Sequence, residues 1–365
     1  MDKMLLEDCC EILDSMRVPI TASDRKEGPY PYYGANGIQD YVAEYTFDDE
    51  LVLLAEDGGN FGSKDRPIAY RVSGKCWVNN HAHVLKPKEG LDVDYLCYSL
   101  MFYNVGGMVN GATRQKLTQA AMRQMQIPKR TMIEQRHIVD LLGRIVAVKE
   151  KRQRELAKLD HLIKARFVEL FEDGESPLKT VEDLCSNIVD CPHTTPKYLG
   201  DLKNPAIRTS EIKKGYIVWD TMRYVSNEEY EERVSRLRPK AGDIVYGREG
   251  TFGNAAVLPE GYNFCLGQRV MLLRPDYTKC TSEYLLHAVI SDDVYRQAIV
   301  KNNVSTVAHV NVKDVKQFKV PLPSFEKQNR FAEFVKQVDK SKVAVQKALD
   351  ETKLLFDSLM QEYFG

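Results

Sequence analysis

The sequence predicts an α+β protein with two similar halves and two long helices. Three observations lead to this prediction. The segment from Pro128 to Phe171 aligns without a gap with the segment from Pro321 to Phe364. Each copy is highly charged and carries apolar residues at helical spacing. Each also follows a stretch that mixes short strand-like runs with Gly, Asn and Pro turns. We therefore predict that the same fold occurs twice in the chain, as a pseudo-two-fold internal repeat.

The two copies of the repeat are predicted to be helices that pair antiparallel as a coiled coil. A proline precedes each one, as is common at helix starts. The second copy has a heptad-like spacing of its mostly apolar residues Val338, Val345, Leu349, Thr352, Phe356, Leu359 and Tyr363. In the first copy the same register is occupied by Ile145, Leu156, Leu159, Ile163 and Leu170. Each helix could run for roughly 40 residues, or about 60 Å, and would need a partner.

We expect these helices to pair with one another and to carry one globular half at each end. The alternative is two unrelated surface helices, each packed on its own domain. The predicted boundaries are 1–127 for the first globular domain, 128–175 for the central helix, 176–320 for the second globular domain and 321–365 for the C-terminal helix.

The repeat extends into the globular halves as matched segments. Glu7–Cys10 parallels Glu182–Cys185, and the glycine turn Gly59–Gly62 parallels Gly250–Gly253. The runs His81–Pro87 and Arg269–Pro275, and the pairs Tyr95-Leu96 and Tyr284-Leu285, also match. Each glycine turn follows a strand-like apolar run, and the loops between the matched segments differ. A shared framework with different loops is typical of one fold that recognises two different targets.

Composition is that of a globular protein, with 365 residues, 43% hydrophobic and 28% charged. The length allows two buried cores. No apolar run is long enough to span a membrane and the first residues are acidic, unlike a signal peptide, so a cytoplasmic location is expected. The eight cysteines are expected to be reduced thiols. A net charge of −1 argues modestly against DNA binding, but a local groove can be positive on a neutral protein.

The sequence motifs that are typical of enzymes are absent or incomplete. Gly58–Asp65 has the glycines and lysine of a phosphate-binding loop in the wrong order. The nearest approach to an adenine methyltransferase tetrapeptide is Asn204-Pro205-Ala206, which lacks the aromatic residue. Neither a nucleophile elbow nor a zinc-binding helix motif is present. His81 and His83 are spaced to bind a metal on one strand face, but such pairs are more often ordinary surface or core residues. We therefore predict neither catalytic residues nor a metal site.

Taken together, the segments resemble the specificity subunit of a Type I restriction–modification system over nearly the whole chain. In the first half the resemblance lies in residues 29–38 (PYPYYGANGI) and in the turn Glu56–Gly62. In the second half it lies in residues 207–212 and in residues 242–253. Residues 321–328 resemble the start of the family's conserved helices. The first copy departs from that pattern at Arg130 and Ile133.

This resemblance implies a subunit without chemistry of its own. The domains 1–127 and 176–320 would be target-recognition domains, each reading one half of a bipartite, asymmetric DNA sequence. The helices would set their separation and dock two modification subunits, which methylate adenine with S-adenosylmethionine. Restriction subunits that use ATP and Mg would join them, so no cofactor is expected in this chain. The alternative is a non-catalytic coiled-coil scaffold that does not bind DNA directly.

Base edges are read mostly by Asn, Gln, Arg, Lys, Ser and Thr side chains on protruding loops. Tyrosines can contact phosphates or stack on an extruded base. In the first half the candidates are Tyr32, Tyr33 and Asn36 in a loop, Asn60 and Lys64 on the glycine turn, Asn80 and His81 before a strand, and Arg114. The alternatives are that the tyrosines cap the core, that the glycine turn is a plain β-turn, and that Arg114 lies on a solvated face.

In the second half the candidates fall in the corresponding regions. They are Thr194, Thr195 and Lys197 in a polar loop, Arg208 and Ser210 after an apolar strand, Arg248 and Thr251 on the glycine turn, and Gln268 and Arg269. Gln268 and Arg269 correspond to Asn80 and His81 of the first half. The alternative for Arg248 and Arg269 is that each pairs with Glu249 or with another carboxylate.

Overall fold

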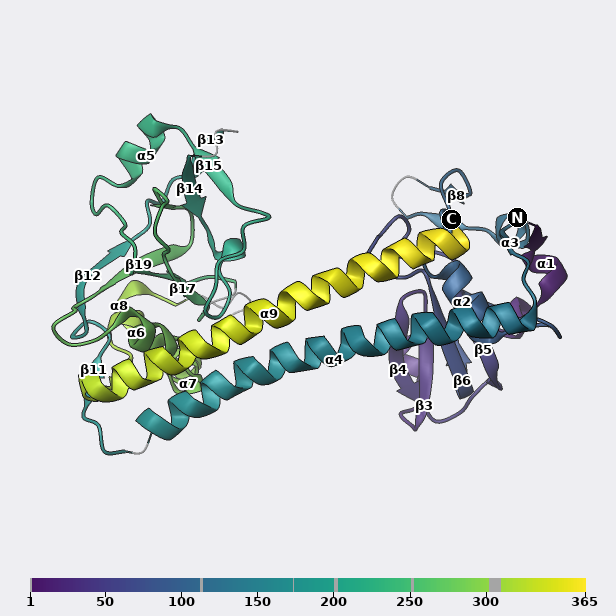
Figure 1. Cartoon of the computed structure of the whole chain (residues 1–365), viewed down its shortest axis with the longest axis horizontal. Coiled ribbons are helices and arrows are strands. Elements are labelled where there is room, and N and C mark those ends of the chain that lie inside the picture. The colour runs from purple at the N-terminus through teal and green to yellow at the C-terminus, as the bar shows by residue number, and fades with distance from the viewer. Residues whose placement is uncertain (1, 112–113, 173, 200–202, 251–252, 302–309) are drawn as a thin grey trace. The chain divides into compact units, whose positions relative to one another are not determined.

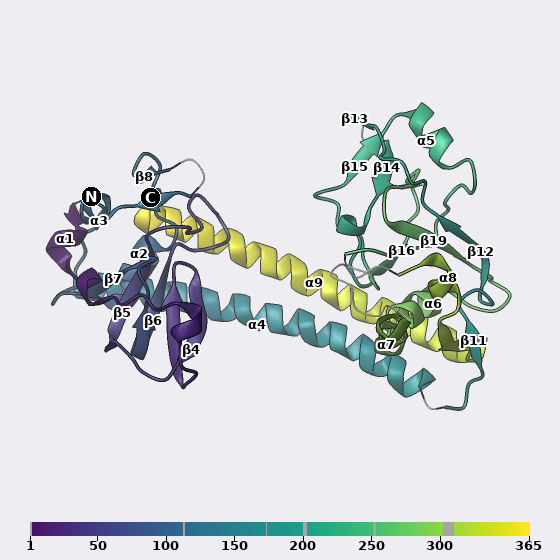
Figure 2. The same ribbon diagram turned by 180° about the vertical axis from the view of Figure 1, so that it is seen from behind.

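The computed structural model describes residues 2–111, 114–172, 174–199, 203–250, 253–301 and 310–365. The chain divides into two compact units (Figure 1, and from behind in Figure 2). Unit 1 comprises Met1–Gln153 together with Lys347–Gly365, and unit 2 comprises Arg154–Gln346. Each unit therefore contains one globular half and parts of both long helices. No helix among the described residues is long and apolar enough to span a membrane. The cysteines are all free.

Unit 1 is built on a six-stranded sheet with the order β2-β7-β5-β6-β3-β4. Its strands are β2 (Cys10–Ile12), β3 (Tyr30–Gly34), β4 (Gly37–Val42), β5 (Phe47–Ala55), β6 (Ala69–Val78) and β7 (Ala82–Pro87). Neighbouring strands are antiparallel except for β3 and β6. In β5, Val52 and Leu54 face a core shared with helix α2 (Val93–Met101), whereas Leu51 and Leu53 face a second core. Burial on both faces explains the continuous apolar run of this strand.

The remaining elements of unit 1 are short. They are β1 (Lys3–Leu5), α1 (Leu6–Cys9), the 3₁₀ turns η1 (Asp14–Met16) and η2 (Ala22–Asp24), β8 (Val109–Asn110), β9 (Lys116–Leu117), α3 (Gln119–Arg123) and β10 (Gln126–Pro128). Strands β1 and β10 pair antiparallel next to the helix start. Residues 30–34, expected in a loop, form strand β3 instead, because they pair with both β4 and β6.

Unit 2 repeats this framework but divides the sheet in two. One sheet has the order β12-β19-β16-β17 and the other β13-β15-β14-β18. The first matches β2-β7-β5-β6, and the strand that corresponds to β6 is split into β17 (Ala255–Val257) and β18 (Cys265–Leu266). The segment between them contains Pro259, which lacks a backbone N–H, and Gly261 with φ 87°. Both residues interrupt strand pairing.

Unit 2 also contains further strands and helices around these sheets. They are β11 (Leu178–Thr180), β12 (Cys185–Asp190), β13 (Tyr198–Leu199), β14 (Asn204–Ile207), η3 (Thr209–Glu211), β15 (Arg223–Val225), α5 (Asn227–Arg233), β16 (Ile244–Gly247), β19 (Val270–Pro275), α6 (Ser282–Val289), α7 (Asp292–Lys301), α8 (Val312–Lys316) and β20 (Lys319–Pro321). Strands β11 and β20 pair as β1 and β10 do in unit 1.

The long helices are α4 (Met132–Phe171) and α9 (Phe325–Phe364), and each has 40 residues. They start at equivalent positions of the repeat, as predicted. The prolines Pro128 and Pro321 do not begin the helices, however, because they end the strands β10 and β20. In α4 the start is set by a capping box. The Thr131 N–H donates to Glu134 Oε2 at 2.8 Å, and the Glu134 N–H donates to Thr131 Oγ1 at 3.3 Å.

The start of one helix packs beside the end of the other within each unit, so the pairing is antiparallel, as predicted. In unit 1, Ile138 and Leu142 of α4 share a core with Phe356 of α9. In unit 2, Phe167 of α4 packs against Phe331 of α9, with ring centroids 5.6 Å apart. The heptad-like residues Val338, Leu349, Thr352 and Phe356 are all buried, as expected for the paired face.

A fully buried glutamine fastens the start of each long helix to its globular half. Gln135 accepts a hydrogen bond from the Asp92 N–H at 2.8 Å and donates to the Gly90 carbonyl at 3.0 Å. Gln328 accepts from the Thr281 N–H at 2.9 Å and donates to the Lys279 carbonyl at 3.1 Å. Asp92 and Thr281 are the N-caps of α2 and α6. The amide thus joins the two helices at the same place in both units.

Replacing either glutamine should destabilise the unit that contains it. Gln135→Leu leaves the part-buried Asp92 N–H without its partner and removes the hydrogen bond to the Gly90 carbonyl, which together costs roughly 1–3 kcal/mol. We expect a matching fall in the free energy of unfolding measured by urea denaturation. Gln153→Leu on the exposed face of α4 is the control and should change it little. Equal stability of Gln135→Leu and the unaltered chain would contradict this role.

Candidate nucleic-acid interface

Turns of unit 1 that are distant in sequence meet around Asp57 and Gly58, directly after β5. The Asn36 side-chain amide donates to the Gly58 carbonyl at 3.0 Å. His81 Nδ1 lies 2.6 Å from Asp57 Oδ1, and Arg114 Nη2 donates to the same oxygen at 2.9 Å. Gly58 has φ +62°, a conformation that favours glycine. Three residues predicted to read DNA, Asn36, His81 and Arg114, are therefore brought together.

The other predicted residues of unit 1 lie in different surroundings. The Tyr32 side chain is 1% exposed and its ring lies under Arg25, with 4.2 Å between the guanidinium carbon and the ring centroid. Burial makes Tyr32 a core residue, so we leave it out of the interface. Tyr33 is half-buried against Tyr70, with ring centroids 5.7 Å apart. Asn60 is half-buried, and Lys64 and Asn80 are exposed.

Beneath these turns lies a buried charged cluster that the sequence patterns do not reveal. Asp14, Glu56 and His83 place potential metal ligands within 4.8 Å of one another. His83 Nδ1 lies 2.7 Å from Asp14 Oδ2, and its Nε2 lies 2.9 Å from the Leu117 carbonyl. Both ring nitrogens are therefore engaged. His81 and His83 alternate along the chain, and only His83 belongs to this cluster.

Two cations already compensate the carboxylates of this cluster. Arg17 Nη1 donates to Glu56 Oε2 at 2.5 Å, and Lys116 Nζ lies 2.9 Å from Glu56 Oε1. A divalent cation here would meet this guanidinium and ammonium at close range, so the donor set does not fit a metal centre. The cluster instead fixes the end of β5, where the Asp57–Gly58 turn begins.

Hydrogen bonding keeps the two carboxylates ionised. Burial opposes ionisation of Asp14, but hydrogen bonds from His83, the Val84 N–H and Gln119 outweigh it and lower the pKa of Asp14. Burial likewise opposes ionisation of Glu56, and hydrogen bonds from Arg17 and Lys116 outweigh it and lower the pKa of Glu56. Both carboxylates therefore stabilise the folded unit when they are charged.

Unit 2 repeats the acid–base pair at its turn. Arg269 Nε lies 3.0 Å from Glu249 Oε2, and these residues take the places of His81 and Asp57. Arg269 has φ 65°, an uncommon backbone conformation for a residue other than glycine. Beside it, the Gln268 side-chain amide donates to Thr195 Oγ1 at 2.9 Å. The predicted residues Thr195, Gln268 and Arg269 thus lie together, and the alternative that Arg269 pairs with Glu249 holds in the free chain.

Arg248 has a different place from the one predicted. Its side chain is buried and its Nη2 donates to Asp190 Oδ1 at 2.7 Å. Strand pairing makes Asp190 the counterpart of Asp14 and Arg248 the counterpart of Glu56. The aspartate is therefore kept in both units, while its side-chain partner is His83 of β7 in unit 1 and Arg248 at the end of β16 in unit 2. Burial removes Arg248 from the interface.

Three of the remaining predicted residues of unit 2, Arg208, Ser210 and Thr194, are held by neighbours that we did not predict. Glu211, fully buried, accepts hydrogen bonds from Arg208 Nε at 3.0 Å and from Ser210 Oγ at 2.7 Å. Thr194 Oγ1 accepts from the buried Arg233 at 3.3 Å. Lys197 is exposed. Thr251 lies outside the described residues.

The buried cluster predicts how unit 1 responds to acid. The contribution of Asp14 is present above its unperturbed pKa of 3.8 and is lost as the pH falls through its lowered folded value. Asp14→Asn should therefore reduce the free energy of unfolding by about 3 kcal/mol at pH 7, because a buried pair loses one partner. The deficit should shrink towards pH 2 in urea denaturation. The control is exposed Asp65→Asn, and a deficit that is the same at both pH values would contradict the assignment.

Comparison with known proteins places this arrangement in a family. Residues 1–159 and 197–352 match the model of the Type I restriction modification DNA specificity domain. A putative type I restriction enzyme specificity subunit of Haemophilus influenzae is 28% identical over 331 residues, which cover 89% of this chain and 84% of that protein. The EcoBI specificity subunit of Escherichia coli is 26% identical over 163 residues, 43% of this chain and 34% of that protein.

Solved structures show the same fold. An S subunit of a Type I restriction–modification system from M. genitalium superimposes with a TM-score of 0.55 at 15% identity, covering 100% of this chain and 96% of that one. The family match takes in both globular halves and most of both long helices, and the fold repeats the same framework in each unit. The chain therefore belongs to the Type I restriction–modification DNA specificity family.

Proposed function

We propose that unit 1 and unit 2 each read one half of a bipartite, asymmetric DNA target. The observation that carries this proposal is the repeated acid–base pair, Asp57 with His81 and Glu249 with Arg269. It occupies the same framework position in both units, but the polar side chains around it differ. An unchanged frame with different surrounding donors suits two different half-sites. Family membership favours this function over a scaffold that does not contact DNA.

The carboxylate in each pair prepares its partner, His81 or Arg269, for base readout. A side chain held by a carboxylate populates few rotamers, so less conformational entropy is lost when it meets a base. Arg269 offers a planar guanidinium, whose usual partner in the major groove is guanine. Asn36, near His81, offers the amide that suits adenine. A chain with a net charge of −1 needs phosphate contacts from its partners, so we expect tight binding only in the assembled complex.

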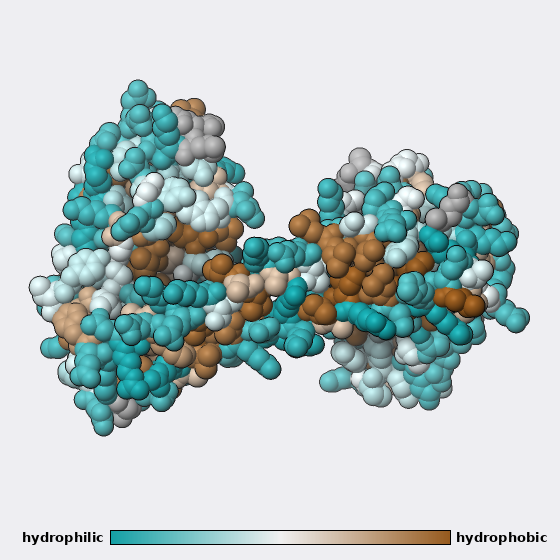
Figure 3. Space-filling view, viewed as in Figure 1, coloured by the Kyte–Doolittle hydropathy of each residue, from teal (hydrophilic) through white to brown (hydrophobic). Residues whose placement is uncertain are grey.

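We propose that the long helices dock two modification subunits, and that methylation with S-adenosylmethionine and ATP- and Mg-dependent cleavage belong to partner subunits. Exposed apolar side chains on α9 support the docking, with Val343 and Leu354 both 70% exposed and Leu355 51% exposed. Figure 3 shows apolar side chains gathered where the end of α9 lies. Leu355 also lines a 320 Å³ groove together with Val148 of α4.

Substitutions in one unit should change only one half of the methylated sequence. Arg269→Ala in the complex with modification subunits should relax one base pair of the unit 2 half-site, and His81→Ala should do the same for unit 1. Loss of a good base contact reduces discrimination by roughly 1–3 kcal/mol, or about tenfold or more. The measurement is methylation of a randomised DNA library followed by sequencing.

Exposed Arg236→Ala, in the same unit as Arg269, serves as the control and should leave the methylated sequence unchanged. If Arg269→Ala altered both half-sites, or neither of them, the assignment of one half-site to each unit would be wrong.

A further inference from the structure

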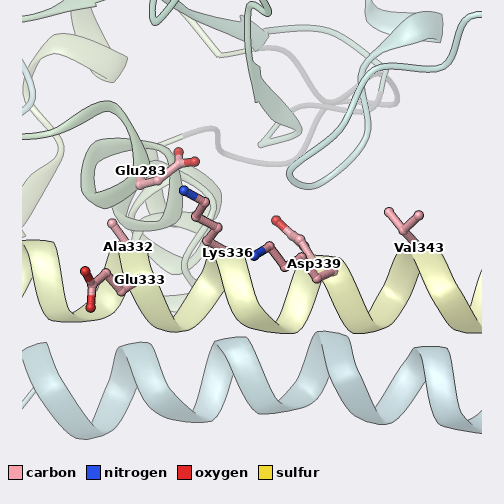
Figure 4. Close-up of a pocket in the computed structure, with 7 residues that line it drawn as sticks. Glu283, Ala332, Glu333, Lys336, Asp339 and Val343 are labelled. Carbon is pink, nitrogen blue, oxygen red and sulfur yellow. The ribbon is translucent and has the colours of Figure 1, made fainter.

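A pocket of 600 Å³ opens in unit 2 between α6 and one face of α9 (Figure 4). Glu283 of α6 lines one side. A row on α9 that includes Lys336, Asp339 and Val343 lines the other. Val343 is 70% exposed, so the pocket has an apolar rim next to its charged groups. All of these residues belong to one compact unit.

One carboxylate oxygen of Glu283 lacks a partner in this pocket. Its Oε2 is buried and forms no hydrogen bond. Burial, together with the nearby Asp339 carboxylate, raises the pKa of Glu283. Lys336 points towards Glu283 in Figure 4 but has an exposed side chain and does not satisfy Oε2. A buried carboxylate oxygen without a hydrogen-bond partner is costly, so the free chain leaves this acceptor incomplete.

Unit 1 shows what completes the corresponding site. Asp94 of α2 follows its N-cap by the same spacing as Glu283 follows the N-cap of α6. Asp94 Oδ1 accepts a hydrogen bond from Arg71 Nε of β6 at 3.1 Å. Arg71 pairs across the sheet with Val52, and at the equivalent register of unit 2 Val257 pairs with Ile244. Unit 1 therefore supplies its own arginine, and unit 2 has a valine in that place.

We propose that this pocket receives a cationic side chain, arginine or lysine, from the modification subunit that docks on unit 2. The proposal rests on the proposed function, because it deepens the docking role of the helices. Glu283 offers an acceptor for a guanidinium or ammonium. Asp339, which lies 3.7 Å from Lys342 Nζ, adds negative charge nearby, and Val343 offers contact for the aliphatic stem. Because Asp94 is already paired, the two docking sites are not equivalent, and the partner on unit 2 binds with an additional anchor.

Glu283→Gln tests this anchor with little change of shape. Removing a buried charge-assisted contact should weaken binding of one modification subunit by roughly tenfold or more. Because Glu283 Oε2 has no hydrogen-bond partner in the free chain, Glu283→Gln should fold about as well as the unaltered chain. Glu326→Gln is the matched control, because it removes the same charge from an exposed position of α9 outside the pocket.

Val257→Arg provides a second, independent variant. It places an arginine where Arg71 stands in unit 1, so the new side chain should pair with Glu283 from within the chain. Val257 is partly buried against the core of unit 2, so the new ion pair has to offset the lost packing. We expect the melting temperature to stay close to that of the unaltered chain, while the affinity for one modification subunit falls as it does in Glu283→Gln. A loss of affinity without a loss of stability separates a filled pocket from a damaged fold.

The measurement is calorimetric titration of the purified modification subunit onto the full-length chain. Two binding events in the unaltered chain, of which Glu283→Gln weakens one and Glu326→Gln neither, would support the anchor. Equal affinities of Glu283→Gln and the unaltered chain would overturn it while leaving the docking role intact. Absence of any binding to the unaltered chain would overturn the proposed docking and the anchor together.

Discussion

Each compact unit depends on both long helices. Unit 1 closes its core with the start of α4 and the end of α9, and unit 2 does so with the end of α4 and the start of α9. The last residues of the chain therefore belong to the same core as the first half, where Phe364 packs against Tyr95 with ring centroids 5.3 Å apart. A 40-residue amphipathic helix has little stability alone, so antiparallel pairing is the constraint that every other feature of the repeat must satisfy.

The framework keeps its contacts even where its charges change. Gln135 and Gln328 make the same hydrogen bonds at the two helix starts. At the end of the central strand, however, Glu56 in unit 1 is replaced by Arg248 in unit 2. The change is tolerated because Asp14 and Asp190 each keep a side-chain partner, which is His83 in unit 1 and Arg248 in unit 2. A frame held in this way can carry different turns, as a protein that reads two different half-sites requires.

Local patterns in the sequence predicted much of this fold. The gapless repeat predicted that α4 and α9 begin and end at matching positions. The apolar runs predicted the central strands β5 and β16. The patterns did not place Pro128 and Pro321 in strands, because the partners β1 and β11 lie at the other end of each half. They also missed Glu211 and the Asp14 cluster, since burial of a polar residue depends on contacts between distant segments. We also predicted Tyr32 and Arg248 to lie in the interface, because local patterns do not show that their side chains are buried in the structure.

The central claim is that this one chain selects a single asymmetric, two-part DNA sequence. The most direct measurement is a genome-wide map of N6-methyladenine in the host, with and without the gene, while active partner subunits are expressed. We predict that deletion removes methylation at one bipartite motif with two different halves and leaves all other motifs unchanged. An identical map in both strains would contradict it.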